Sequence, residues 1–209
     1  MHDLEAAFFA RHDPALVPVV RKATVGIAGA GGLGSNVAIA LARSGIGRLV
    51  LADFDVIEPS NLNRQQFFID QIGLPKVEAL KENLVRMNPF SRYKIHRVML
   101  DARNIAEIYA DVDMMVEAFD KVEMKLMLVE TWAKIFPDRP LITGSGVAGY
   151  GGNNECRTEH LFDNVYVCGD MKSDADLIPP LAPKVALIAA MQANLVLELL
   201  VHGKPAHQG

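Results

Sequence analysis

The chain is poor in cysteine and has no strong excess of either charge, and each lack excludes a class of protein. Its two cysteines, Cys156 and Cys168, cannot supply a disulfide framework, and such sparse use is typical of a reducing compartment. Lysine and arginine total 21 against 25 acidic residues, which gives a net charge of −4 without any basic run. Nucleic acid is therefore not expected as a main partner.

A secretory signal and an uninterrupted apolar run long enough to cross a membrane are also missing. Residues 1–14 contain no cationic segment followed by an apolar core. The long apolar stretch at residues 185–201 is interrupted by Gln192, Asn194 and Glu198, so the pattern favours a buried helix. We therefore expect a soluble, cytoplasmic protein with no membrane partner.

Half of the 209 residues are hydrophobic, and no internal repeat or low-complexity tract divides the chain. This length and composition suit a single domain with a sizeable core. We expect residues 1–23 to form a partly helical lead-in and residues 24–145 to form a nucleotide-binding core. Residues 146–209 would then supply a crossing loop, an extra strand and a C-terminal helix.

The chain is organised around residues 24–55, TVGIAGAGGLGSNVAIALARSGIGRLVLADFD. An apolar run leads into a glycine-rich turn, an apolar helical pattern follows, and a second apolar run ends at Asp53. This order predicts a strand–helix–strand unit that binds a nucleotide, with its phosphates at the start of the helix. Asp53 is placed to accept hydrogen bonds from ribose hydroxyls. The glycines of the turn are Gly29, Gly31, Gly32 and Gly34. The alternative interpretation is that they are needed only for tight packing of the helix against the strand.

Strand and helix patterns alternate after this unit. The alternation predicts a Rossmann-like α/β fold, with a mainly parallel sheet, helices on both faces and an irregular C-terminal extension. Ligands of such sheets lie at the carboxyl ends of the strands, near the switch point. Met124 and Met127 belong to the inner stripe of one helix, where we expect them to fill the core. The expected strands are residues 93–100, 112–118, 140–144 and 160–168. The expected helices are residues 76–87, 123–136 and 185–201, and residues 101–109 are expected to form a short helical turn.

A polar loop, residues 56–72, leaves the second strand and has no clear period. A loop of this length at a strand's carboxyl end commonly carries function. It contains Arg64, and Lys76 opens the helix that follows, so two cations could wrap a triphosphate. Asn61 can hydrogen-bond phosphate or base, and Asp120, at a neighbouring strand end, can ligate Mg²⁺. The alternative is that these are solvated loop charges and a helix cap.

Five short motifs follow one another in a fixed order: GAGGLGS at residues 29–35, LADFD at 51–55, SNLNRQ at 60–65, GLPK at 73–76 and AFD at 118–120. With these motifs the sequence resembles the ThiF/MoeB/HesA adenylyltransferases, which are related to ubiquitin-activating enzymes. The resemblance covers roughly residues 20–150. GVAGYG at 146–151, CGD at 168–170 and the closing helix look like the short ThiF subgroup linked to thiamine biosynthesis.

The resemblance implies ATP and Mg²⁺ as cofactors and a ubiquitin-like sulfur carrier protein with a Gly-Gly C-terminus as the partner. The carrier's terminal carboxylate would attack ATP to give an acyl adenylate and pyrophosphate, and the enzyme would be a homodimer. Arg64 would polarise the α-phosphate, Lys76 would contact the phosphates and Asp120 would coordinate Mg²⁺. The nucleotide would also contact Gly29, Gly31, Gly32, Gly34, Asp53, Asp55, Ser60, Asn61, Asn63 and Gln65.

The chain departs from this family in several places. Many relatives carry two Cys-x-x-Cys pairs for zinc, and the two lone cysteines here predict no zinc site. Cys168 lies where some relatives handle sulfur, although an inert, partly buried thiol is the simpler interpretation. Arg11 is the best candidate for an arginine that relatives supply to a partner subunit. Residues 169–183, proline-rich and acidic, could form a mobile flap near the carrier tail or a plain connector.

Three functions remain open. An adenylating enzyme could serve thiamine, molybdopterin or other sulfur-carrier pathways. A nicotinamide-dependent oxidoreductase would explain residues 29–53 but would leave the SNLNRQ block and Lys76 without a role. A non-catalytic binding scaffold is disfavoured because Arg64, Lys76 and Asp120 are all present.

Overall fold

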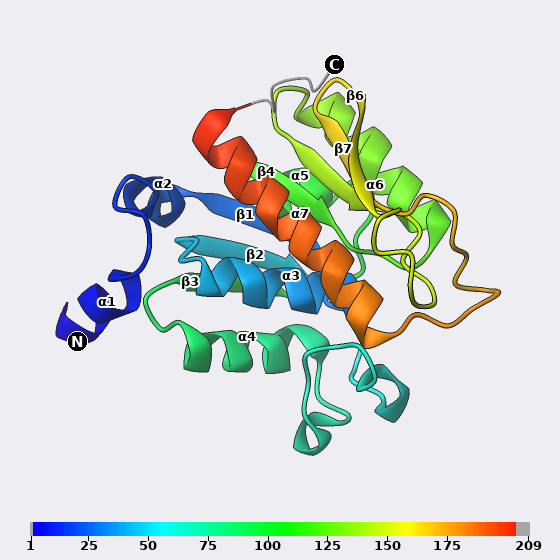
Figure 1. The fold of residues 1–209 in the computed structure, drawn as a ribbon, viewed down its shortest axis with the longest axis horizontal. Helices are drawn as coiled ribbons and strands as arrows, with labels where there is room; N and C mark the ends of the chain where they lie inside the picture. The colour runs from blue at the N-terminus through cyan, green and yellow to red at the C-terminus, as the bar shows by residue number, and fades with distance from the viewer. Residues whose placement is uncertain (1, 204–209) are drawn as a thin grey trace.

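A computed structural model describes residues 2–203 of the chain (Figure 1). Its centre is a seven-stranded sheet with the order β3-β2-β1-β4-β5-β7-β6. Neighbouring strands pair in parallel except for β6, which pairs with β7 in antiparallel fashion. The strands are β1 (Thr24–Ala28), β2 (Arg48–Ala52), β3 (Arg92–His96), β4 (Met114–Glu117), β5 (Leu141–Gly144), β6 (Arg157–Phe162) and β7 (Val165–Gly169).

Helices cover both faces of the sheet, which confirms the predicted α/β architecture. One face shares a hydrophobic cluster with α3, α4 and α7, and the other face packs against α5 and α6. The helices are α1 (His2–Phe9), α2 (Val17–Lys22), α3 (Gly32–Arg43), α4 (Lys76–Met87), α5 (Ile105–Ile108), α6 (Val122–Ile135) and α7 (Ala182–His202), and two 3₁₀ turns are η1 (Pro59–Asn61) and η2 (Ile69–Gln71).

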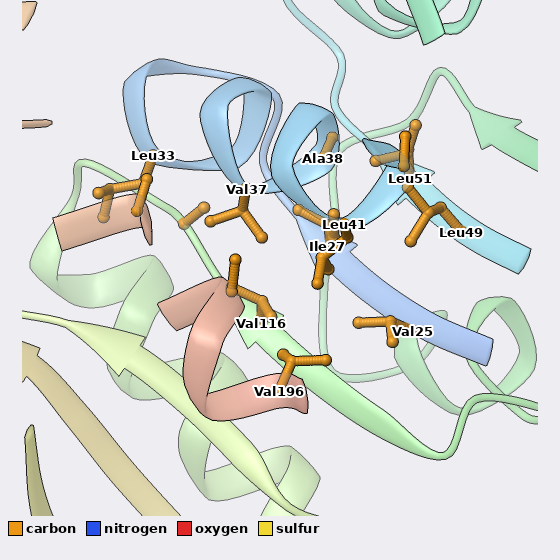
Figure 2. Close-up of a cluster of buried hydrophobic side chains, with 14 of the residues drawn as sticks. Val25, Ile27, Leu33, Val37, Ala38, Leu41, Leu49, Leu51, Val116 and Val196 are labelled. Atoms are coloured by element: carbon orange, nitrogen blue, oxygen red, sulfur yellow. The ribbon is translucent and has the colours of Figure 1, made fainter. Parts of the chain in front are cut away.

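The larger core is built where α3 and α7 lie over β1. In Figure 2, Val37 and Leu41 of α3 point toward Ile27 of β1, with Val116 of β4 and Val196 of α7 beside them. All five side chains are fully buried. Because helices also cover the opposite face, β1 and its neighbours are apolar on both sides, as is usual for strands of a parallel sheet. The central strand is thus held rigidly along its length.

The order of the strands creates a switch point between β1 and β4. From β1 the chain moves outward through β2 to β3, and it then returns to the other side of β1 for β4 and β5. The loops that leave the carboxyl ends of β1 and β4 therefore run in opposite directions and leave a crevice between them. Gly29 follows β1 at this place, and Ala118 follows β4.

The prediction of a single strand over residues 160–168 is wrong. The structure forms a hairpin instead, in which β6 is the exposed edge strand and β7 is buried beside β5. The turn lies at Asp163 and Asn164, and Asp163 has a φ of 44°. Aspartate and asparagine tolerate this left-handed region better than other non-glycine residues. Apolar and polar residues alternate through the turn as they do in a strand, so the sequence pattern does not reveal the turn.

The strand predicted over residues 93–100 is too long. β3 ends at His96, and residues 98–100 leave the sheet at its carboxyl edge. The last helix begins earlier than expected, at Ala182, because Pro183 fits the first turn of a helix. α7 is long and apolar enough to cross a membrane, but its buried residues pack against α3 and the sheet. That packing is what a core helix requires.

Candidate functional site

A pocket of about 320 Å³ opens at the carboxyl ends of β1, β2 and β4, at the switch point of the sheet. This volume falls within the range of small-molecule sites, about 300–1,000 Å³. The pocket brings together many of the residues that the sequence singled out. The predicted residues that line the pocket are Gly29, Gly31, Gly32, Asp53, Asp55, Arg64, Gln65, Lys76 and Asp120.

The glycine-rich turn presents the start of α3 to the pocket. Gly29 has a φ of +98°, and a Cβ at Gly34 would lie only 1.9 Å from the carbonyl oxygen of Gly29. Gly34 is therefore needed for close packing of the helix on the turn, and it does not line the pocket. Gly31 occupies the N-cap position and leaves the first turn without a side-chain cap. The free N–H groups there suit a phosphate.

Asp53 lies at the end of β2 and joins two parts of the site. Its Oδ2 accepts a hydrogen bond of 2.6 Å from the Ala30 N–H, and its Oδ1 accepts one of 2.8 Å from the Asp55 N–H. The carboxylate thus fixes the glycine-rich turn against the strand end. An ionised carboxylate has about four acceptor positions. Two remain for the ribose hydroxyls that we expect it to bind.

Lys76 is a buried cation at the start of α4. Its side chain is 9% exposed, and its Nζ lies 2.8 Å from Oδ2 of Asp55. The backbone N–H of Lys76 also donates to the carbonyl of Asp55, at 3.0 Å. The pair holds the ammonium group at the pocket wall, and an ammonium group has three donors. The remaining donors can bind phosphate oxygens.

Arg64 is oriented by the loop that carries it. Its Nη1 donates to Oδ1 of Asn63 at 2.8 Å and to the carbonyl of Ser60 at 3.2 Å. The side chain of Asn61 points away from the pocket, since its Oδ1 accepts the Glu58 N–H at 3.1 Å. Ser60, Asn61 and Asn63 therefore do not line the pocket in this conformation, and the loop they build delivers Arg64 to it.

The loop is joined to α3 by side chains that sequence reasoning did not single out. The Asn36 Nδ2 donates to the Arg64 carbonyl at 3.0 Å, and the Asn36 Oδ1 accepts from Nε2 of Gln66 at 2.6 Å. The Ser35 hydroxyl accepts the Gln66 N–H at 3.2 Å. Ser35 and Asn36 are polar residues in an otherwise apolar helix, and this pattern is the sequence signal that predicts a polar contact between the helix and the loop. The loop and the start of α3 consequently form one rigid wall.

Gln65 is a buried polar residue of this wall. Its side chain lies near Gly31, and its Oε1 has no hydrogen-bond partner among residues 2–203. Buried polar atoms in native proteins are nearly always satisfied by protein, water or ligand. The Nε2 group of the same amide lies on the side of Gly31, so Gln65 adds a polar donor to the pocket wall beside the glycine-rich turn.

The opposite wall of the pocket is largely apolar and was missed by the sequence prediction. Val98 and Leu100 come from the segment after β3, Phe119 follows β4, and Met124 comes from the first turn of α6. Met124 was expected to fill the core, but it faces the pocket instead. An apolar wall of this kind suits a flat aromatic ring, such as a nucleobase, better than it suits a charged part of a ligand. Met99, Phe54, Ala52, Ala118 and Lys121 complete the lining.

Asp120 is an exposed carboxylate at the rim of the pocket, in the turn between β4 and α6. It makes no hydrogen bond or ion pair with any described residue. No group of three or more potential metal-ligating side chains comes together within residues 2–203. Mg²⁺ commonly needs only one or two carboxylates, with substrate phosphates and waters as its other ligands. A single free carboxylate beside a phosphate pocket fits that donor set.

The N-terminal lead-in lies away from this pocket. Arg11 is exposed in the turn between α1 and α2 and does not line the pocket of its own chain. A larger, flatter hollow of about 750 Å³ lies under α1 and α2, near the amino ends of the strands, and its walls are mostly apolar. The proposed contact of Arg11 with a partner subunit stays a prediction.

Comparisons with known proteins agree with this geometry. The sequence profile described as the ThiF family matches residues 6–208. The molybdopterin-synthase adenylyltransferase of Escherichia coli strain K12 is 29% identical over 194 residues, which cover 86% of this chain and 74% of that protein. The adenylyltransferase and sulfurtransferase uba4 of Aspergillus niger is 35% identical over 133 residues, 63% of this chain. The match spans only 27% of uba4, so the chain corresponds to a part of that longer protein.

Solved structures share the fold. The E. coli tRNA N6-threonylcarbamoyladenosine dehydratase TcdA, in complex with AMP, superposes with a TM-score of 0.84 over 93% of each chain, at 20% identity. Its complex with ATP gives a TM-score of 0.82 at 21% identity, over 98% of this chain and 96% of that one. At these identities the similarity establishes the architecture of the chain.

Cys168 lies at the end of β7 and is fully buried. Its Sγ is 3.5 Å from the hydroxyl of Thr158, and burial raises the pKa of the thiol to about 11. The thiolate is the nucleophilic form of cysteine, so this side chain is inert at neutral pH in the conformation described. The structure thus favours the inert thiol over a sulfur-handling role. Cys156, by contrast, is partly exposed.

We expect iodoacetamide at neutral pH to alkylate Cys156 at least about 100-fold faster than Cys168, because Cys168 is both buried and protonated. Mass spectrometry of tryptic peptides over time measures both rates. In denaturant the two rates should become similar. Equal rates in the folded protein would contradict the inert assignment.

Proposed function

We propose that this chain, which belongs to the ThiF family, transfers an adenylyl group from ATP to the C-terminal carboxylate of a ubiquitin-like sulfur carrier protein. One observation carries the proposal. Two oriented cations, Arg64 and Lys76, a free carboxylate, Asp120, and the uncapped start of α3 all face one pocket. The names of the relatives, which are adenylyltransferases, and the ATP and AMP complexes of the structural neighbours support the same assignment.

The pocket suggests how ATP is held. The base lies against the apolar wall that includes Leu100 and Phe119, and the ribose hydroxyls donate to Asp53. The phosphates lie at the start of α3, where N–H groups and the helix dipole favour anions. Lys76, held by Asp55, reaches the same phosphates. This arrangement assigns the ribose to Asp53 and the phosphates to Lys76 and the start of α3.

The reaction is an in-line displacement at the α-phosphorus. A carboxylate oxygen of the carrier forms a bond to this phosphorus, and the bond to the α–β bridging oxygen breaks. Pyrophosphate leaves with the electron pair, and an acyl adenylate remains. Arg64 stabilises the charge that develops on the α-phosphate oxygens, so its contribution is larger in the transition state than in the ground state. Catalysis of this kind is mostly positioning and electrostatics.

Asp120 would hold Mg²⁺ together with phosphate oxygens. The ion supplies neutralisation of charge on the phosphates and the leaving pyrophosphate. Asp120 suits this role because its carboxylate is exposed at the rim and is not engaged by any neighbour within residues 2–203. By contrast, Asp53 and Asp55 are occupied by backbone and lysine donors.

For the carrier we propose a ThiS-like protein of thiamine biosynthesis with a Gly-Gly terminus. The support is the resemblance of the C-terminal motifs to the short ThiF subgroup. A molybdopterin-type carrier is the second candidate, because a molybdopterin-synthase adenylyltransferase matches most of this chain. A nicotinamide-dependent oxidoreductase is disfavoured, since it would not require two cations at the phosphates and a free carboxylate at the rim.

We propose that the segment between β7 and α7 closes over the carrier tail. A buried ion pair of 2.6 Å between Asp170 and Lys184 fixes its two ends. Its first half is joined to the crossing loop, because the Ser173 hydroxyl accepts the Ala148 N–H at 3.1 Å. Val185 of α7 lies beside Gly32, so the segment ends next to the phosphates. Closure of the predicted flap, residues 169–183, during the reaction stays a prediction.

Arg64→Ala should reduce carrier-dependent ATP–pyrophosphate exchange by about 100-fold or more, because a preorganised charge at the reacting phosphate is removed. ATP binding, measured by calorimetry, should weaken far less. Arg43→Ala is a matched control, since Arg43 is exposed at the far end of α3. Normal exchange by the Arg64 variant would remove this residue from the mechanism.

Asp120→Asn should lower exchange by about 100-fold or more and make the residual rate insensitive to Mg²⁺. The fold should survive, because Asp120 is exposed. Circular dichroism and a Mg²⁺ titration of the rate test both statements, with Asp138→Asn as the surface control. Wild-type turnover with an unchanged Mg²⁺ titration would show that the role is assigned to the wrong residue.

We also propose that the chain is a homodimer and that α7 contributes to the interface. Its outer face exposes small and apolar residues, including Ala186, Ala190 and Val201. Light scattering at micromolar concentration should give twice the chain mass of 22.8 kDa. Ala190→Glu should dissociate the dimer, whereas Ala102→Glu, a change in the exposed turn before α5, should not. A species of chain mass alone in the wild type would refute the proposal.

A further inference from the structure

Glu117 is the last residue of β4 and is fully buried. It lies directly before the turn that carries Phe119 and Asp120. Its Oε1 accepts the Phe119 N–H at 2.7 Å, and its Oε2 accepts hydrogen bonds from Nζ of Lys125 and the hydroxyl of Thr143. The carboxylate thus links the turn to α6 and to β5.

This cluster differs from the core beneath it. On the same face of the sheet, Met115 and Leu141 pack against Leu128 and Trp132 of α6 in an apolar cluster. Two residues further along each strand, at the next position on the same face, the chain has Glu117 and Thr143 in place of apolar residues. The change occurs at the carboxyl ends of β4 and β5, and the end of β4 leads into the turn that lines the pocket.

Stability alone does not explain a buried charge at this position. Removal of a carboxylate from water is costly, and the three donors offset that cost only when their geometry is good. Apolar residues of similar volume often replace a buried ion pair without loss of stability. The adjoining apolar cluster shows that this interface can be packed with apolar side chains. A polar link that specifies one conformation of the turn accounts for the arrangement better.

We propose that Glu117, with Lys125 and Thr143, is a positioning residue for the turn at residues 118–121. All four residues of this turn line the pocket. The hydrogen bond to the Phe119 N–H sets the direction of the turn, and the Lys125 contact fixes α6 relative to it. That this turn geometry matters for catalysis, by placing Asp120 at the nucleotide, rests on the proposed adenylyl-transfer function.

The pairing has a second consequence for the site. Glu117 and Asp120 are three residues apart, and only Asp120 is exposed. Glu117 forms its ion pair with Lys125 inside the protein, and Thr143 adds a hydrogen bond to the same oxygen. Asp120 is then the free carboxylate of the turn, available to a cation at the rim.

Two sets of variants test the proposal. The double variant Glu117→Met/Lys125→Met removes the ion pair without leaving a buried charge. Thr143→Val removes one donor at nearly constant shape, whereas Thr143→Ser keeps the hydroxyl. Lys134→Met, an exposed change in the last turn of α6, is the matched control. The Thr143 pair decides the question if the double variant does not fold.

The first measurement is hydrogen–deuterium exchange of a peptide covering residues 118–122, without ligand. We expect at least about tenfold faster exchange in the double variant, because the Phe119 N–H loses its acceptor. Thr143→Val should show a smaller increase, and Thr143→Ser and Lys134→Met should match the wild type. Unchanged exchange in the double variant, or in Thr143→Val if the double variant does not fold, would overturn the proposal.

The second measurement separates positioning from a general loss of structure. In ATP–pyrophosphate exchange, kcat of the double variant should fall about 10- to 100-fold, while KM for ATP stays within about threefold. The Mg²⁺ concentration for half-maximal rate should rise. A variant with wild-type kcat and Mg²⁺ response would overturn the proposal. If the wild type shows no exchange with any carrier, the proposed function fails, and the deuterium measurement still decides the role of Glu117.

Discussion

The site depends on the close approach of α3 to the turn that follows β1. A Cβ at Gly34 would overlap the carbonyl of Gly29, and a Cβ at Gly29 would lie 2.8 Å from the carbonyl of Ala118. Two positions without side chains therefore bring the helix start, the end of β1 and the end of β4 into contact. The apolar core under α3 and α7 holds them there. Without this contact, the N–H groups of α3 and Asp120 would not face the same pocket.

The polar residues around the pocket fall into two groups by what they contact. Those that face the pocket, such as Arg64, Lys76 and Asp120, are arranged around the place of the phosphates. Two residues support them: Asp55, itself at the pocket wall, holds Lys76, and Asn63, outside the lining, orients Arg64. Charged side chains in a pocket are effective when their rotamers are fixed by neighbours. The supporting residues are therefore as necessary to the proposed chemistry as those that would touch ATP.

Much of the fold could be predicted because the spacing of apolar residues along the sequence shows which side of each helix or strand is buried. The sequence order of the motifs, from the glycine turn to Asp53, shows which functional group follows which strand. Because the strands are parallel, their carboxyl ends and these groups lie at the same edge of the sheet. The direction of a side chain is not contained in that order. Asn61 has a residue type that suits phosphate, but the turn uses its amide for a backbone donor. Met124 has helical spacing typical of core, but α6 begins at the pocket and points it there. The hairpin at Asp163 was missed because alternation continues through it.

The most direct test of the central claim is the incorporation of labelled pyrophosphate into ATP in the presence of a carrier protein that ends in Gly-Gly. The account predicts incorporation that requires Mg²⁺ and stops when the terminal glycine of the carrier is removed. Candidate carriers of the thiamine and molybdopterin types should be compared in the same assay, together with a nicotinamide-nucleotide binding measurement. Absence of incorporation with every carrier, together with tight binding of a nicotinamide nucleotide, would contradict the account.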